Sequence, residues 1–396
     1  MPYKVRATPN SVGLTNATSG GGGGISLTLD RIPGAMTELW LKVGANLTIA
    51  GGGTTPLDDF WDRAIASLSL VYGSTGYFNF SDMTLAHHLM RFQGMATPRL
   101  AIPTTATSTT FYTWYRLHFG TVPYQMDKVT GRWKANEFDL SGAVPQLPAQ
   151  SLSLTGTWGG STSYAASGVT VNSLTLQPYF TYISNKENES AADFQPQAFP
   201  NWISENDSAM ITTGTLPLPV SDYVQAVLFA TRTGTPALRS DAVLTSLKFR
   251  DQSGSRDIFS FGAWSDATAM TQQARNGADD GHPASDSISG TTYAYVPGSV
   301  GVAGTVFGST FIQPSNPGLA YFDMRDWISE PDPYLGLNMD PAVNPFSQLV
   351  WQYGSNTSAS NALALLYKKY KKNQSATPQV AGLHPAVASA MAAAGR

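Results

Sequence analysis

Two pairs of adjacent carboxylates have the residue type for acid–base catalysis. They are Asp58-Asp59 and Asp279-Asp280. A glycosidase needs two carboxylates held about 5–9 Å apart across a sugar cleft, whereas neighbouring residues in a turn point in different directions. Loop acids that cap turns explain both pairs better. The sequence therefore predicts no catalytic carboxylate pair.

The histidines do not have the spacing of a metal site. His87 and His88 are consecutive, whereas two ligands on one helix face are four residues apart. His118, His282 and His384 lie in unrelated segments. We therefore expect no metal site.

Nucleophile and phosphate motifs are equally weak. The sequence has no Gly-x-Ser-x-Gly elbow behind a buried strand, and its glycine clusters at residues 20–24 and 51–53 lack the Lys-Ser/Thr ending of a phosphate loop. Because the chain has no cysteine, thiolate metal sites, cysteine nucleophiles and disulfides are excluded. We expect neither cofactors nor catalytic residues, so the sequence indicates a protein that is not an enzyme.

Aromatic side chains could line a carbohydrate-binding face, since the chain has 17 tyrosines and 9 tryptophans. Five tryptophans fall within or beside strand patterns, where packing in a core or against another subunit is the commoner use. They are Trp114, Trp158, Trp264, Trp327 and Trp351. A carbohydrate- or receptor-binding β-sandwich module therefore stays open as the alternative function.

A lysine cluster near the C-terminus is the most asymmetric feature of the charge distribution. Lys368, Lys369, Lys371 and Lys372 belong to a segment, residues 361–396, that has five basic groups and no acidic one. The rest of the chain has 19 basic and 27 acidic groups. Such a cluster is attracted to anionic lipid or nucleic acid, so the four lysines are candidates to face a membrane or nucleic acid. A solvated tail, or pairing with a neighbouring subunit, is the alternative.

Composition indicates an all-β protein with hidden surface. The 37 glycines and 25 prolines supply frequent turns between short strands, and only 13% of residues are charged. An isolated domain usually presents about 25–35% charged residues on its surface, so partners are expected to cover much of this one. A secreted sandwich coated with Ser, Thr and Asn is the alternative. No signal peptide or membrane span is expected, because no apolar run is long enough.

Strand patterns repeat in the two halves of the chain. Segment 39–80 reads as strand, spacer, strand, Gly/Ser turn and aromatic strand, and segment 224–261 repeats that order. Helix is expected only at residues 82–92, where the apolar residues share one face. The last strand is expected at residues 362–367. The sequence thus predicts two tandem eight-stranded jelly rolls with short helices in the connecting loops.

The predicted boundaries follow composition. Residues 1–24 form a flexible N-terminal arm that ends in five glycines, residues 25–214 the first jelly roll, residues 215–370 the second, and residues 371–396 a C-terminal tail. The boundary between the rolls lies in the Pro- and Thr-rich run 212–219.

Several stretches resemble, in order, the double jelly-roll major capsid proteins of tectiviruses and related tailless viruses with an internal membrane, which share their fold with the adenovirus hexon. They are Glu38–Ile49, Asp59–Tyr72, His87-His88 with Phe92, Tyr112–Gly120, Leu140–Gln146 and Gly318–Asp326. The collinear order of these stretches, rather than any single motif, supports the resemblance.

The resemblance implies a homotrimer of double jelly rolls that forms a pseudo-hexagonal capsomer and tiles an icosahedral shell over an internal membrane. Its partners would be further copies of itself, penton and minor capsid proteins, and the membrane, reached through the C-terminal tail. No recognition of a specific nucleic-acid sequence is implied. The protein would be found in the virion, after assembly in the host cytoplasm.

Overall fold

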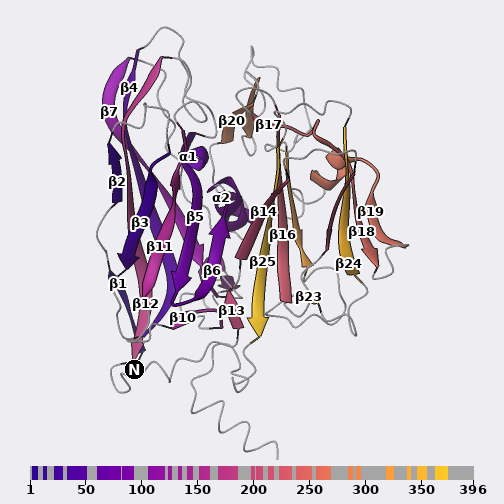
Figure 1. Ribbon diagram of the computed structural model, residues 1–396, viewed down its shortest axis with the longest axis horizontal. Helices are drawn as coiled ribbons and strands as arrows, with labels where there is room; N and C mark the ends of the chain where they lie inside the picture. The colour runs from indigo at the N-terminus through magenta and orange to yellow at the C-terminus, as the bar shows by residue number, and fades with distance from the viewer. Residues whose placement is uncertain are drawn as a thin grey trace, which may run out of the picture.

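The computed structural model is built mostly of strands (Figure 1). It describes residues 2–7, 12–15, 22–29, 34–50, 60–81, 83–92, 106–120, 124–126, 133–135, 141–145, 151–160, 168–185, 198–200, 202–207, 213–217, 223–233, 238–251, 256–268, 284–288, 291–295, 318–324, 337–339, 346–354 and 362–372.

The first half of the chain forms a two-sheet sandwich. One sheet, the outer sheet, has six strands: β1 (Pro2–Ala7), β2 (Val12–Thr15), β4 (Ala35–Ile49), β7 (Thr107–His118), β10 (Val144–Pro145) and β12 (Val169–Asn185). Facing it are β3 (Gly24–Leu29), β5 (Ile65–Tyr72), β6 (Thr75–Phe80) and β11 (Leu152–Trp158). Two helices, α1 (Phe60–Arg63) and α2 (Met83–Phe92), precede β5 and follow β6.

The second half forms another sandwich. One layer contains β16 (Tyr223–Thr233), β17 (Leu238–Arg239), β22 (Leu319–Asp323), β23 (Leu337–Asn338) and β25 (Ala362–Lys372). The other, the distal sheet, contains β15 (Thr213–Pro217), β18 (Leu244–Asp251), β19 (Asp257–Phe261) and β24 (Phe346–Tyr353). Two separate two-stranded ribbons pair β8 (Tyr124–Met126) with β9 (Trp133–Ala135), and β20 (Ala284–Ile288) with β21 (Thr291–Tyr295).

Strand pairing repeats between the halves and confirms the predicted double jelly roll. In the first, β4 pairs with β7, β10 and β12, while β5 pairs with β6 and β11, and β11 pairs with β3. In the second, β16 takes the place of β4 and pairs with β22, β23 and β25. There β18 pairs with β19 and β24, and β24 pairs with β15. Eight strands of each half therefore correspond one to one.

A connecting strand joins the two rolls into one structure. Strand β14 (Trp202–Asp207) pairs in parallel with β6 of the first roll and antiparallel with β25 of the second, and β13 (Ala198–Pro200) also pairs with β25. The result is one eleven-stranded sheet, the junction sheet, that runs through both rolls. Figure 1 shows α2 beside β6 and β14, between the two halves.

One glycine position depends on a close backbone approach at the start of β22. Gly318 has φ +74°, and a Cβ there would lie 2.6 Å from the carbonyl oxygen of Thr231. Its own carbonyl accepts a hydrogen bond from the Thr231 amide at 2.8 Å. A side chain would force β22 away from β16.

Two hydrophobic cores fill the rolls. The first lies between the outer sheet and β3, β5, β6 and β11, and it continues to Ala226, Leu228 and Tyr321 of the second roll. The second lies against the distal sheet and includes Phe229 and Phe322.

None of the described helices is long and apolar enough to cross a membrane.

The structure corrects several predicted boundaries. Residues 2–7 and 12–15, placed in a flexible arm, are strands paired with β12. Residues 213–217 form one strand of the second roll, so that roll begins before residue 215. The last strand continues through Lys372, because β16 and β13 offer pairing partners beyond Tyr367. Residues 373–396 of the predicted tail lie outside the described part of the chain.

Candidate functional site

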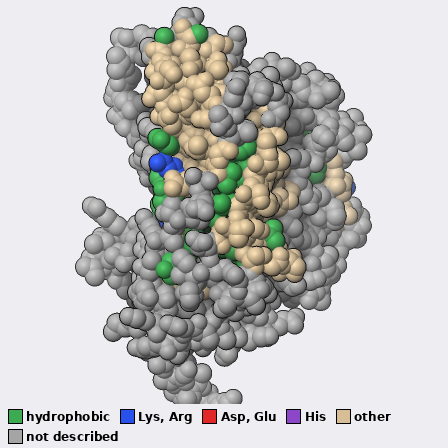
Figure 2. All heavy atoms as spheres, turned by 60° about the vertical axis from the view of Figure 1, so that its left-hand side comes forward, with side chains coloured by type: hydrophobic (Ala, Val, Ile, Leu, Met, Phe, Trp, Pro, Cys, Tyr) green, Lys and Arg blue, Asp and Glu red, His purple; other side chains and the backbone are tan. Residues whose placement is uncertain are grey.

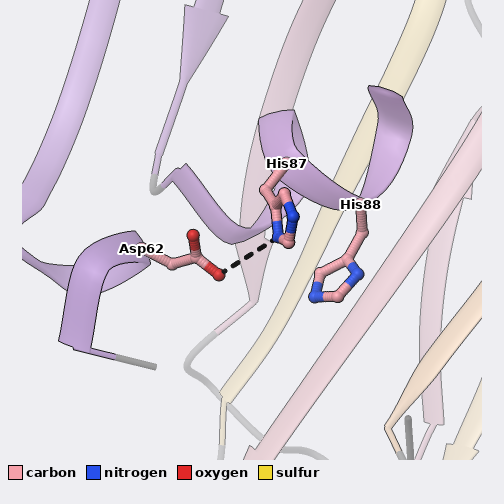
Figure 3. A group of neighbouring side chains, drawn as sticks. All are labelled: Asp62, His87 and His88. Carbon is pink, nitrogen blue, oxygen red and sulfur yellow. Dashed lines mark ion pairs between the residues drawn. The ribbon is translucent and has the colours of Figure 1, made fainter. Parts of the chain in front are cut away.

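A buried polar cluster lies where α1 approaches α2. Asp62 extends from α1, and His87 and His88 extend from α2 toward it (Figure 3). The Asp62 Oδ2 atom and the His87 Nδ1 atom are 3.8 Å apart. Side-chain exposure is 0% for Asp62, 5% for His87 and 1% for His88. The cluster is therefore part of the interior of the protein.

Packing of strands around α2, rather than the local sequence pattern, buries both consecutive histidines. A helix with one apolar face would place one of two neighbouring residues toward solvent. Residues 83–90 of α2 are buried without exception, because the helix contacts β5, β6 and β7 of the first roll and β16 and β25 of the second. The predicted helix at 82–92 is confirmed at Met83–Phe92, but it is a helix enclosed on all sides.

Tyr115 of β7 completes the cluster. Its hydroxyl donates a hydrogen bond of 3.1 Å to Asp62 Oδ1, and its ring meets the His87 ring edge-on, with centroids 6.3 Å apart. The carboxylate is therefore held from one side while its other oxygen faces His87. Sequence reasoning missed this group because Asp62 and Tyr115 are distant from the histidines in the chain.

Potential ligand atoms of Asp62, His87 and His88 all lie within 4.8 Å of one another. A carboxylate and two imidazoles are a donor set suited to divalent transition metals. The prediction of no metal site used the spacing of the histidines alone, and the fold adds a third donor that this spacing does not reveal.

A second polar group is buried under the outward surface of the outer sheet. Arg116 donates to Glu38 Oε1 through its Nε atom at 3.1 Å and also through Nη2. Trp40 donates its indole N–H to Glu38 Oε2 at 3.0 Å. Burial raises the pKa of Glu38, but the Arg116 charge and hydrogen bonds, with His118 and Trp40, together hold that pKa below its usual value.

Half-buried aromatic and cationic side chains cover the same surface. Trp114 lies 6.4 Å from Trp40 and 5.3 Å from Tyr179 between ring centroids. The Lys42 ammonium lies 4.1 Å from the centre of the Tyr112 ring, and Tyr112 is 39% exposed. We name this surface the outer aromatic face; it consists of Trp40, Lys42, Tyr112, Trp114, Arg116 and Tyr179.

Uncharged polar side chains continue this surface toward one end of β4, β7 and β12. Asn172 donates to Asn46 and Thr48, and Asn46 donates to Thr110. Figure 2 shows a tan region of uncharged polar groups and backbone above green apolar patches, with few blue basic atoms, and no acidic side chain is visible among the described atoms of that view. The low charge of the sequence is thus visible on this side of the molecule.

The candidate lysines occupy the last strand. Lys368 is 0% exposed, and its ammonium lies 5.2 Å from the centre of the Trp202 ring and 5.8 Å from that of Tyr370. The expectation that Lys368 faces a membrane or genome is therefore corrected, because the junction sheet encloses it. Lys369, Lys371 and Lys372 lie in β25, and their side chains are outside the described part of the structure.

Other predicted residues divide between core, surface and undescribed segments. Trp158, Trp264 and Trp351 are buried in the cores, and Trp114 belongs to the outer aromatic face. His118 is buried, and its Nδ1 accepts a hydrogen bond from the Gly120 amide at 3.1 Å. The remaining candidates lie outside the described residues: Asp58, Asp59, Asp279, Asp280, His282, His384 and Trp327.

Comparison with solved structures finds the same fold over nearly the whole chain. The STIV MCP, a double jelly-roll major capsid protein, aligns with a TM-score of 0.57 and 14% identity, covering 93% of this chain and 96% of that one. A chain of Sulfolobus turreted icosahedral virus aligns with a TM-score of 0.61 and 15% identity, covering 99% and 96%. VP54 of PBCV-1, fitted into a reconstruction of the virophage Sputnik, gives 0.51 and 11%, covering 93% and 94%.

These likenesses establish the double jelly-roll fold and confirm the resemblance read from the sequence at the level of fold. No protein-family model matches the sequence. No curated protein matches it either.

Proposed function

We propose that this chain is the major capsid protein of an icosahedral virus, a structural protein without catalytic activity. The observation that carries the proposal is the double jelly roll, which aligns along 99% of the chain with a chain from an icosahedral virus. The internal duplication supports it as well. Three copies of a chain with two similar rolls present six similar lobes, which is the outline that packs into a hexagonal lattice.

In this proposal the chain associates first with itself. Homotrimers form capsomers, capsomers form the shell together with penton and minor capsid proteins, and the shell encloses an internal membrane in the virion, after assembly in the host cytoplasm. Lys369, Lys371 and Lys372, with the residues after them, stay the proposed contact to anionic lipid head groups. Recognition of a specific nucleic-acid sequence has no part in it.

Carbohydrate binding is the second candidate, and the outer aromatic face favours it. Half-exposed Trp and Tyr rings can stack on sugar rings, and the neighbouring cations can bind their hydroxyl or acidic groups. The same residue types are enriched in subunit interfaces. The composition of the outer aromatic face therefore fits both a capsid protein and a carbohydrate-binding module, and an experiment is needed to distinguish them.

The experiment is a mass measurement of the purified chain by light scattering over a series of concentrations. A capsomer gives a mass near three times the 42.2 kDa of the chain that persists on dilution. A glycan-binding module gives a monomer that binds a glycan array, and Tyr112→Ala with Trp114→Ala abolishes that binding while Thr109→Ala, on the same strand, does not. A monomer that neither binds glycans nor forms shells under electron microscopy contradicts both functions.

A further inference from the structure

The buried cluster at α1 and α2 carries an inference that is independent of the capsid proposal. Its three donors belong to the set that binds zinc and similar cations: two imidazoles and one carboxylate. All three side chains are at most 5% exposed. A carboxylate without any contact to solvent needs positive charge close by, because burial strongly disfavours the ionised form.

Separations between donors are close to those around a bound ion. Asp62 Oδ2 and His87 Nδ1 are 3.8 Å apart, which exceeds a direct hydrogen bond of about 2.7–3.2 Å. Ligands at about 2.0–2.1 Å from a tetrahedral ion lie roughly 3.3 Å from one another. The outermost separation in the group is 4.8 Å, so side-chain shifts of about 1 Å would close the three donors onto one ion.

The surrounding residues orient the donors as an outer ligand shell does. Tyr115 occupies Asp62 Oδ1 with its hydrogen bond, which directs Oδ2 toward the histidines. The His87 and His88 rings are tilted by 50° with centroids 4.8 Å apart, and in Figure 3 both rings extend to the side of α2 on which Asp62 lies. Hydrogen-bonded carboxylates and fixed rings are typical of metal sites.

The position of the cluster gives an ion a structural consequence. Helix α2 lies between the rolls, and Arg232 of β16 donates a hydrogen bond to Thr84 of this helix. Tyr370 of β25 donates to the carbonyl oxygens of Phe119 and Gly120 at the end of β7. An ion that ties α1 to α2 would therefore fix the helix against which strands of both rolls pack.

We propose that Asp62, His87 and His88 bind one divalent transition-metal cation, with Zn²⁺ as the best match, and that this ion stabilises the junction between the jelly rolls. Tyr115 is a positioning residue that orients Asp62. The remaining coordination position would be filled by water.

The test uses the full chain stripped of metal by a chelator and then refolded from urea with or without ZnCl₂, because buried donors load slowly in a folded protein. We expect one zinc per chain by elemental analysis, a higher melting temperature with zinc, and, with Co²⁺ in its place, the visible absorption of a low-symmetry site. No bound zinc together with identical melting temperatures overturns the proposal and leaves the cluster as an ion-pair network.

Variants locate the site. Asp62→Asn and His88→Gln should each lower bound zinc at least tenfold, and Tyr115→Phe should weaken zinc binding by about 10–100-fold in a chelator competition. His118→Gln, which changes an equally buried histidine outside the cluster, should retain one zinc. Zinc retained by Asp62→Asn and His88→Gln overturns the assignment. If those variants do not fold, the stoichiometry and Co²⁺ spectrum of the unmodified chain still decide.

Discussion

Strands β4 and β16 occupy the same place in their jelly rolls but have different surroundings. Strand β4 buries one face against the first core and presents the other outward, where the outer aromatic face lies. Strand β16 is buried on both faces, with only its terminal residues partly exposed. Ala226, Leu228 and Ala230 belong to the first core, and Val224, Val227 and Phe229 to the second. Strand β16 therefore separates the two cores and contributes side chains to both.

The sequences of the two strands reflect this difference. β4 alternates apolar residues with Trp40, Lys42, Asn46 and Thr48, as a strand with one exposed face does. β16 is a nearly continuous apolar run, as a strand buried on both faces must be. A register shift between Val224 and Ala226 reverses which face each residue meets. The two rolls are therefore coupled through shared packing as well as through β14.

The largest loss of stability is expected from Leu228→Ala in β16. Leu41→Ala in β4 is its matched control. Both leucines are fully buried in the first core, and each substitution should lower the free energy of unfolding by about 2–5 kcal/mol. Because β16 has the second core on its reverse face, Leu228→Ala should also raise hydrogen exchange in β18 and β24. Leu41→Ala should raise exchange in the first roll alone.

Equal patterns of hydrogen exchange in the two variants would contradict the view that β16 couples the two cores. If hydrogen exchange rose only in the first roll in both variants, the packing of the second core would not depend on Leu228, which lies on the opposite face of β16. A pattern spread over both rolls in both would show that the whole chain opens as one unit.

The second prediction concerns the outward face of β4, where Glu38→Gln removes a buried charge. The substitution leaves Arg116 without its carboxylate and should lower the free energy of unfolding by about 1–3 kcal/mol near neutral pH. Because the pKa of Glu38 is lowered in the folded state, its contribution is fully present above its usual value near 4.5 and is lost as pH falls through the lowered pKa.

Urea denaturation between pH 3 and pH 7 checks this. The difference in stability between the unmodified chain and Glu38→Gln should be constant above about pH 5 and should shrink at lower pH. A difference that does not depend on pH would mean that Glu38 acts through packing and hydrogen bonding rather than through its charge.

Local patterns in the sequence predicted much of the fold. Alternation in β4, the hairpin from Ile65 to Phe80 and the helix after it were all foreseen, and the order of strands 39–80 recurs in 224–261 as expected. These features depend on periods of two or 3.6 residues and on turn residues, which are local properties. The duplication is visible in sequence for the same reason.

Features that depend on distant segments could not be read in this way. A run of lysines indicated contact with a membrane or nucleic acid, yet Lys368 is buried and its ammonium lies beside the rings of Trp202 and Tyr370. Residues 2–7 indicated an arm, yet they pair with the far end of β12. The group of Asp62, His87 and His88 requires the closure of α1 onto α2. Each of these is a tertiary contact that no local pattern encodes.

The smallest loss of stability is expected when the exposed ion pairs of the second roll are removed. Their carboxylate, Asp257, can be compared with the buried carboxylate of Glu38. Asp257 accepts hydrogen bonds from Lys248 at 2.8 Å and from Arg250 at 2.7 Å. These hydrogen bonds and charges lower the pKa of Asp257, as Arg116 does for Glu38. All three side chains are, however, about one-third exposed, and water and salt screen such pairs.

Asp257→Asn should therefore leave the urea midpoint unchanged at about 150 mM salt and lower it slightly at about 10 mM salt, where the screening length is roughly fourfold greater. Any contribution that Asp257 makes should disappear as pH falls through its lowered pKa. A loss of stability as large as that of Glu38→Gln, or one that salt does not reduce, would mean that burial does not determine how much each carboxylate contributes to stability. Geometry would then be the deciding factor, since both carboxylates accept two or more hydrogen bonds from cationic or indole N–H groups.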